Sequence, residues 1–265
     1  MVGRVAARVS WRPSLSNATA RAARSSLSFG GGHRQFRRGG EDSHLDHGNE
    51  RMNFQPSVGC GYGSNNSLGL PKRLLVLGES HYGAEPRPDI TKEVVREVFD
   101  EDVPYRYRFF TSIFKAFCRS GREPTREALA EFCCAFAFYN FIQEMIVKPG
   151  VRPSQAHWEG DVAPFLECLK MWKPSHVVAC GFELWDNLPD KGFSRLAVET
   201  ERDFFGQLPD QGKRRLDYRR PGNWIGRYEY GGGSCLILRT RHPSVAFSAS
   251  EWRPVLRSFF QLERD

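Results

Sequence analysis

The chain has 265 residues, of which 40% are hydrophobic and 13% aromatic, so it can build a sizeable core and wholesale disorder is excluded. No apolar run approaches the roughly 18 residues that a transmembrane helix needs. The net charge of +7 comes from the first 40 residues, which hold eight arginines and no acidic residue and leave 30 basic against 31 acidic residues in the rest. The total charge therefore does not by itself indicate nucleic-acid binding.

The basic segment 1–51 is rich in Arg, Ser, Ala and Gly and has no sustained apolar period. Three interpretations are open: a transit peptide, a disordered arm that binds nucleic acid, or a start assigned too early, with Met52 as the true first residue. We favour the third. We therefore exclude 1–51 from the fold, place the folded domain at 52–265, and expect a prokaryotic cytoplasmic protein ahead of an organellar one.

Four short apolar runs predict strands that are buried on both faces: Arg73–Leu77, Ala135–Ile142, His176–Cys180 and Cys235–Leu238. Between and after them, helical patterns cover Asp89–Phe99, Arg106–Arg119, Arg126–Cys133 capped by Thr125, Ala163–Trp172, and a last helix toward Phe260 in which Ser248 and Glu251 have capping-box spacing. This alternation predicts an α/β fold, a three-layer α/β/α sandwich with a four-stranded, mostly parallel sheet.

Residues 189–231 do not follow this alternation of strands and helices. They are polar, contain Lys213-Arg214-Arg215 and Arg219-Arg220, and close with Gly231-Gly232-Gly233. We predict an insertion or long loop with a hairpin, and we favour a solvated surface over a basic loop that faces DNA.

The seven cysteines form no CxxC pair, and most lie in apolar runs, which is typical of small buried side chains in a reducing compartment. Their spacing gives no support for a zinc site or an iron–sulfur cluster. We therefore expect neither a metal nor an organic cofactor.

Polar side chains follow the end of each predicted strand. Gly78-Glu79-Ser80-His81-Tyr82-Gly83 follows the first, Asn140 lies near the end of the second, Gly181 follows the third and Arg241-His242-Pro243-Ser244 follows the fourth. In open α/β sheets, ligands bind beyond the carboxyl ends of the strands. A carboxylate, an amide, an imidazole and several hydroxyls are thus expected at one rim, which is the candidate site.

These motifs, together with "FYNFIQEMIVKPGVRPS" and "FLECLKMWKPSHVVACG", resemble the uracil-DNA glycosylase superfamily over residues 70–260. The resemblance implies a DNA glycosylase, with DNA as its partner. We expect a monomer without a membrane or metal partner. Such an enzyme flips a base out of DNA, hydrolyses its N-glycosidic bond and leaves an abasic site.

The resemblance also implies roles for individual residues. His242 would stabilise negative charge on the departing base, and Glu79 would position water and stabilise the sugar cation, while Asn140 would read the base. Ser80, His81 and Tyr82 would line the base pocket, with Tyr82 against the 5-position. The expected DNA contacts are Ser154, Arg241, Ser244, Ser248 and, as a wedge that fills the vacated stack, Phe247.

Two positions depart from the uracil pattern. Ser80 stands where the best-known uracil-excising members have a catalytic Asp, and His81 replaces the Pro that follows. We therefore favour a cytosine with a large 5-substituent, as in phage DNA, and a role in antiviral defence. Uracil excision in base-excision repair is the alternative.

Two rival classes remain open. The strand followed by Gly-Glu-Ser also resembles the opening of an esterase superfamily, with Ser80 as nucleophile and His242 as base. However, Arg239 and Thr240 occupy the stretch where that family has its Asp. The other rival is a DNA-binding relative that has lost catalysis. A nucleotide cofactor is disfavoured, because the Gly59–Gly69 cluster precedes its strand and no Walker loop is present.

Overall fold

The computed structural model describes residues 52–83, 85–100, 103, 107–118, 123–148, 150–208, 223–245 and 247–262. The basic segment 1–51 and the two basic clusters around Lys213 and Arg219 lie outside these residues, so the predictions made for them stay predictions. Among the residues described, no helix has the length and apolar character needed to cross a membrane.

A seven-stranded mixed sheet forms the centre of the fold, with the strand order β1-β4-β2-β6-β9-β8-β7. The four neighbours β4, β2, β6 and β9 are parallel and correspond to the four predicted apolar runs. The strands are β1 (Ser57–Val58), β2 (Leu74–Gly78), β4 (Phe136–Asn140), β6 (His176–Cys180), β7 (Phe193–Arg195), β8 (Ile225–Tyr230) and β9 (Gly233–Thr240).

The prediction of a four-stranded sheet was wrong, because antiparallel strands extend both edges of the parallel core. On one side β1 pairs with β4 over only two residues. On the other side, segment 189–231 supplies β7, β8 and a helix, and β8 forms a hairpin with β9 through Gly231 and Gly232. Edge strands carry polar residues, so they lack the continuous apolar run that marks a strand buried on both faces.

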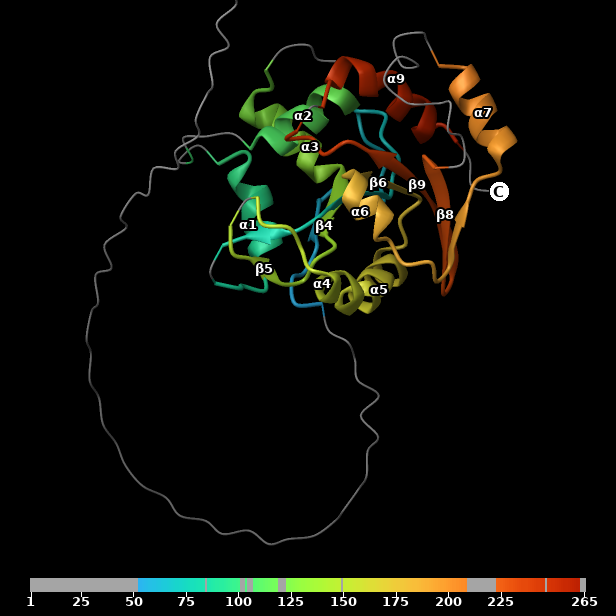
Figure 1. The fold of residues 1–265 in the computed structure, drawn as a ribbon. Helices are drawn as coiled ribbons and strands as arrows, with labels where there is room; N and C mark the ends of the chain where they lie inside the picture. Colours follow the sequence, from blue (N-terminus) through green and yellow to red (C-terminus); the bar gives the residue numbers. More distant parts are fainter. Residues whose placement is uncertain are drawn as a thin grey trace, which may run out of the picture. The chain divides into compact units, whose positions relative to one another are not determined.

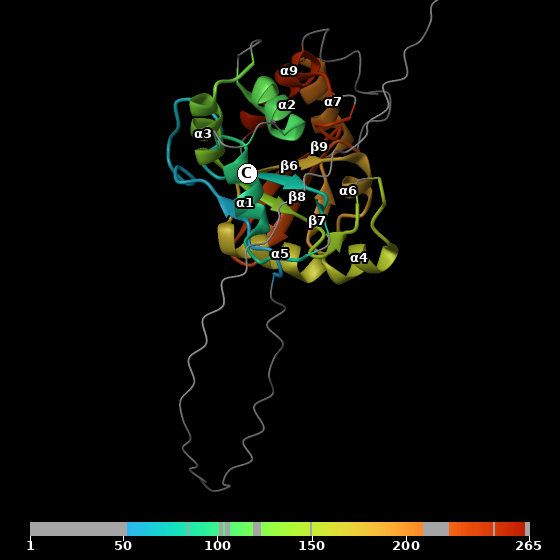
Figure 2. The same ribbon diagram turned by 90° about the vertical axis from the view of Figure 1, so that its left-hand side faces the viewer.

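Helices cover both faces of the sheet (Figure 1), and a view turned by 90° shows the same two layers (Figure 2). Leu74 and Val76 pack into the first layer, whereas Leu75 and Leu77 pack into the second, as the two-residue period of a strand requires. The first layer contains α1 (Ile90–Glu97), α2 (Arg108–Phe117), α3 (Arg126–Cys134), α7 (Val198–Gly206) and α9 (Ala249–Phe260). The second contains α4 (Gln155–Gly160), α5 (Val162–Trp172) and α6 (Phe182–Asp186).

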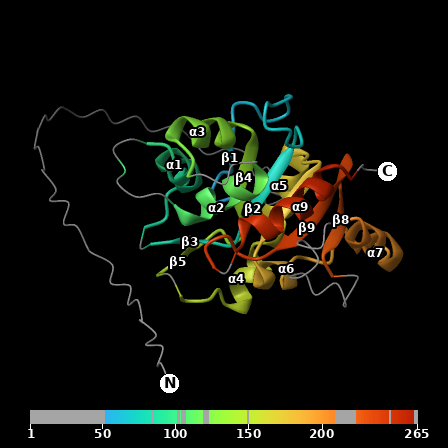
Figure 3. The ribbon, with the colours of Figure 1, turned by 90° about the horizontal axis from the view of Figure 1, so that it is seen from above.

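A second, two-stranded sheet lies beyond the end of β2. It pairs β3 (His81–Tyr82) with β5 (Met145–Ile146) in parallel, and the two strands lie side by side in Figure 3. Because β3 begins three residues after β2 ends, this small sheet fixes the course of the Gly78–Gly83 motif.

Candidate functional site

The carboxyl ends of the four parallel strands meet at one rim. Gly78 of β2 is in register with Asn140 of β4, and Cys180 of β6 is in register with Thr240 of β9. Backbone hydrogen bonds continue past the strand ends, from Ile142 N to Glu79 O at 2.8 Å. The structure therefore brings together the strand-end segments that the sequence singles out.

Glu79 is buried at this rim, with 6% of its surface exposed. Its Oε2 accepts a hydrogen bond from Arg152 Nη2 at 2.7 Å, and the same guanidinium also pairs with Glu183 at the start of α6. Burial raises the pKa of Glu79, the Arg152 guanidinium opposes that rise, and the Glu183 carboxylate adds to it. Arg152 is the cation that compensates the buried charge.

Asn140 lies against the backbone of Gly78. A Cβ atom at position 78 would lie 2.1 Å from Asn140 Oδ1, so this close approach requires glycine. Asn140 is only 5% exposed, yet its carboxamide makes no hydrogen bond to any residue in the part of the chain that the structure describes. A buried amide with unused donors and acceptors is ready to bind a polar ligand.

His242 follows β9 and is held in one tautomer. Its Nδ1 accepts a hydrogen bond from Ser244 N at 3.2 Å, so the proton of the neutral ring resides on Nε2. Burial lowers the pKa of His242, and the nearby Arg152 charge lowers it further. The imidazole therefore stays neutral at physiological pH and presents an N–H donor.

Phe109 of α2 lies beside both His242 and strand β4. Its ring centroid lies 5.5 Å from that of His242 and 5.5 Å from that of Phe138. Phe138 and Asn140 are two residues apart on β4 and share a face of the sheet. The half-buried Phe109 ring, the Asn140 amide and the His242 imidazole thus lie on the same side of the rim.

Sequence reasoning missed Arg152 and Phe109 as site residues. Arg152 belongs to a loop rather than a strand end, although it lies within the quoted run that continues to Ser154. Phe109 has the spacing of an ordinary core residue of an amphipathic helix. The only sequence signal was the place of Arg152 within a quoted motif, and Phe109 had none.

The predicted base-pocket residues separate to different sides. The hydroxyl of Ser80 is buried and has no hydrogen-bond partner among the residues that the structure describes. His81 turns away from the rim, since its Nε2 pairs with Thr91 Oγ1 at 2.8 Å and its ring packs edge-on against Phe54. Tyr82, next along β3, points outward and is 41% exposed. Successive side chains of a strand alternate, so these two neighbours cannot share one pocket wall.

Two of the predicted DNA contacts precede helices. Ser154 is the N-cap of α4, where its Oγ accepts a hydrogen bond from His157 N at 3.4 Å. Ser248 precedes α9, but its Oγ lies 3.2 Å from Ser250 Oγ instead of capping the helix. The Ser154 hydroxyl therefore already has a structural role.

The loop after His242 presents a different apolar residue from the one predicted as a wedge. Phe247 stacks on Trp252 at 5.8 Å between ring centroids and packs against the first helical layer. Val245, by contrast, is 66% exposed. Ser244 is half-buried in the same loop, and the Arg241 guanidinium lies 5.6 Å from the ring of Phe182.

No protein-family model matches the chain, and no curated protein shows significant sequence similarity to it. In the described ranges, no group of three or more His, Cys, Asp or Glu side chains could hold a metal ion.

Proposed function

We propose that this protein is a DNA glycosylase, a divergent relative of the uracil-DNA glycosylases that hydrolyses the bond between a flipped pyrimidine and its sugar. The observation that carries the proposal is the grouping of a neutral His242 donor and the Phe109 ring with an unbonded Asn140 amide, together with Arg152, which pairs with the buried Glu79 carboxylate and also acts on the pKa of His242. The three-layer arrangement with four adjacent parallel strands, whose ends carry the motifs, further supports it.

Each group has a task in that reaction. The flipped base stacks on Phe109, and Asn140 pairs with its Watson–Crick edge. As the glycosidic bond breaks, the electron pair moves to the base, and the Nε2–H of His242 donates to a base carbonyl oxygen that becomes negative. Because this donor is neutral beforehand, its interaction strengthens as charge develops, which lowers the barrier rather than only the binding energy.

Glu79 acts on the other side of the broken bond. Its carboxylate accepts a hydrogen bond from the attacking water and stabilises the oxocarbenium character of the sugar. The water oxygen forms the new bond to the sugar carbon, and its proton leaves to the carboxylate and then to solvent. Arg152 keeps Glu79 ionised against the cost of burial, so that it can act as a base.

For the substrate, we propose a cytosine that carries a bulky group at its 5-position, as in modified phage DNA, and hence a role in antiviral defence. In uracil-specific relatives the residue that corresponds to Tyr82 is expected against the 5-position. The outward direction of Tyr82 and the turn of His81 toward Thr91 support a pocket that is open on that side.

One assay tests both the reaction and the substrate. Duplexes that contain uracil, a thymine mismatch, 5-hydroxymethylcytosine or its glucosylated form are incubated with the full chain, and abasic sites are cleaved with alkali. We expect cleavage and a released base, identified by mass, with the glucosylated duplex cleaved fastest. If uracil is released faster, uracil excision in base-excision repair replaces the proposed substrate. If no duplex acquires an abasic site, the glycosylase proposal is overturned.

Matched variants assign the cleavage to this rim. Glu79→Gln removes the buried carboxylate, whereas Glu167→Gln removes a surface carboxylate of α5 that pairs only with Lys170 among the residues described. Only the first should lose activity. Ser80→Ala separates the esterase alternative, because a serine nucleophile would be essential, whereas a glycosylase retains part of its rate.

A further inference from the structure

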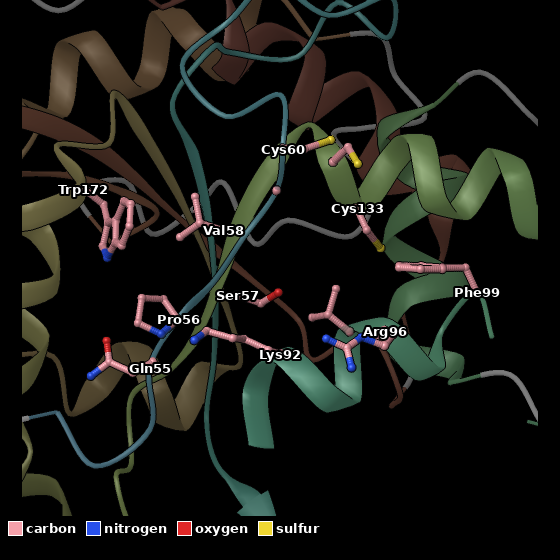
Figure 4. Close-up of a pocket in the computed structure, with 13 residues that line it drawn as sticks. Gln55, Pro56, Ser57, Val58, Cys60, Lys92, Arg96, Phe99, Cys133 and Trp172 are labelled. Carbon is pink, nitrogen blue, oxygen red and sulfur yellow. The ribbon is translucent and has the colours of Figure 1, made fainter. Parts of the chain in front are cut away.

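A cavity of about 410 Å³ lies at the β1 edge of the sheet, and none of the strand-end residues of the rim lines it. It is lined by the chain around β1, by Lys92 and Arg96 of α1, by Trp172 at the end of α5, and by Cys60, Cys133 and Cys134 (Figure 4). Of the seven cysteines, three thus gather at one opening to solvent.

The backbone holds Cys60 beside Cys134. Gly59 N donates to Phe136 O at 3.0 Å, and Gly61 N donates to Cys134 O at 2.9 Å, so the residues on both sides of Cys60 are paired. A Cβ at Gly59 would lie 2.3 Å from Cys134 O, so only glycine permits this approach. The pairing extends the β1–β4 ladder and fixes the position of Cys60 along it.

The two thiols are also close enough to affect each other's titration. Burial raises the pKa of the Cys134 thiol, the neighbouring Cys60 side chain raises it further, and the Cys60 backbone lowers it. Figure 4 shows the Cys60 sulfur directed toward the end of α3, which is where Cys134 lies. The backbone pairing and the direction of the Cys60 side chain thus point to Cys134 as its partner.

Access to solvent distinguishes the three cysteines. Cys60 is exposed and Cys134 is partly exposed, whereas Cys133 is buried. Burial raises the pKa of the Cys133 thiol to about 12, so it stays protonated and unreactive. An oxidant in the cavity therefore meets Cys60 first, with Cys134 as the neighbouring thiol.

We propose that Cys60 and Cys134 form a reversible disulfide when a peroxide enters this cavity. The Cys60 thiolate attacks one peroxide oxygen, the O–O bond breaks, and water leaves after protonation, so that Cys60 becomes a sulfenic acid. The Cys134 sulfur then attacks the Cys60 sulfur, the S–O bond breaks, and the hydroxyl leaves as a second water with the Cys134 proton. Two thiols and one peroxide thus become one disulfide and two waters, and a dithiol reductant reverses the change.

The bond would close a covalent loop that contains part of the rim. Both Glu79 and Phe109 lie in the chain between Cys60 and Cys134, whereas Asn140 and His242 lie outside it. Oxidation would therefore restrict the segment that carries the proposed water-binding carboxylate and stacking ring. The proposal itself stands on the two thiols and is independent of the reaction at the rim.

The test treats the reduced full chain with one equivalent of hydrogen peroxide, blocks the remaining thiols by alkylation, and maps the peptides by mass. We expect a Cys60–Cys134 linked peptide that disappears after dithiothreitol. In Cys134→Ser, Cys60 should accumulate as a sulfenic acid that a dimedone probe traps, and in Cys60→Ser, Cys134 should stay reduced.

Cys118→Ser is the matched control, since Cys118 is a partly exposed cysteine at the end of α2 and does not line the cavity. It should form the same disulfide at the same rate as the unchanged protein. Circular dichroism checks that each variant is folded, and Cys60→Ala replaces Cys60→Ser if that variant is not. A link from Cys60 to any other cysteine, oxidation of Cys60 without a link, or no oxidation of Cys60 would overturn the proposal.

Discussion

Two neighbouring regions contain the same kinds of titratable group and use them differently. At the rim, burial raises the pKa of Glu79 and lowers that of His242. Beneath the β3 strand, burial raises the pKa of Asp161 to about 6 and lowers that of His81 to about 4. The pKa shifts alone do not distinguish the two regions, so they cannot identify the site.

Hydrogen bonding does distinguish them. In the second region, named here the inner cluster (Phe54, His81, Thr91, Gln143 and Asp161), each polar side chain has at least one hydrogen-bond partner. Asp161 Oδ2 accepts from Gln143 N at 2.8 Å, Gln143 Oε1 accepts from Phe54 N at 2.9 Å, and His81 pairs with Thr91. At the rim, by contrast, the Asn140 amide and the His242 N–H have no partner among the described residues. A saturated network stabilises the fold, and an unsaturated one is open to a ligand.

The sharpest test of this contrast replaces each of the two histidines with alanine. His242→Ala should lower the single-turnover rate by roughly 10²–10³-fold with little change in DNA affinity, because its donor acts in the transition state. His81→Ala should instead lower the free energy of unfolding and leave the rate of the folded fraction near normal. Single-turnover kinetics, DNA titration and urea unfolding of both variants measure this, and a His81 variant with the larger rate loss would reverse the assignment.

The inner cluster predicts a pH effect on stability. The pKa of His81 is about 4 in the folded state and 6.5 in the unfolded state. The unfolded state therefore takes up the proton first, and the free energy of unfolding falls by about 3 kcal/mol as the pH falls from 6.5 toward 4. The pKa of Asp161 is about 6 folded against 3.8 unfolded, so the folded state gains about 3 kcal/mol over nearly the same fall in pH. The two terms oppose each other in the unchanged protein.

In Asp161→Asn, the effect of His81 on the free energy of unfolding is no longer offset. The amide oxygen of Asn still accepts the hydrogen bond from Gln143 N, but the side chain no longer titrates. We expect its free energy of unfolding to fall by about 3 kcal/mol more than that of the unchanged protein between pH 6.5 and 4. His81→Gln should change in the opposite direction and gain stability on acidification. Parallel curves for all three proteins, from urea titrations at each pH, would contradict the coupling.

Arg152 and Glu183 offer a smaller but directional test at the rim. The Arg152 charge lowers the pKa of Glu79 and the Glu183 charge raises it, and the water-binding role needs an ionised Glu79. Arg152→Gln should therefore move the acidic limb of the pH–rate profile to higher pH, and Glu183→Gln should move it to lower pH. Each pH unit of movement changes the rate on that limb about tenfold. Arg152→Lys keeps the positive charge and should therefore shift the acidic limb less than Arg152→Gln does. Shifts in the same direction for both Gln variants would exclude this electrostatic role.

The predictable part of the fold is the part set by local pattern. The run His176–Cys180 forms β6 with the predicted bounds, and Thr125 caps α3 by accepting a hydrogen bond from Ala128 N at 3.2 Å. The strand β1 was not predictable, because two residues become a strand only through pairing with β4. Ser248 was correctly placed before the last helix, yet its hydroxyl contacts Ser250 instead of the helix backbone.

The same limit applies to the candidate site. Glu79, Asn140 and His242 could be placed at one rim because parallel strands end together, which is a rule of topology. Arg152 and Phe109 could not, since their positions depend on how a loop and a helix pack over that rim. The direction of His81 likewise followed from the small β3–β5 sheet, whose two-residue strands leave no periodic signal.

The smallest effect is expected for the two apolar residues of the loop after His242, Val245 and Phe247, whose roles can be told apart by mutation. Val245→Ala should leave stability unchanged and lower the single-turnover rate on duplex DNA a few-fold, because an exposed side chain at this rim can fill the space that a flipped base vacates. The rate on single-stranded DNA, which has no stack to fill, should not change. Phe247→Ala should instead destabilise the fold by about 2 kcal/mol, since it removes the ring that stacks on Trp252. If the Phe247 variant, assayed while folded, loses the duplex preference and the Val245 variant keeps it, then Phe247 leaves Trp252 on DNA binding and is the wedge after all.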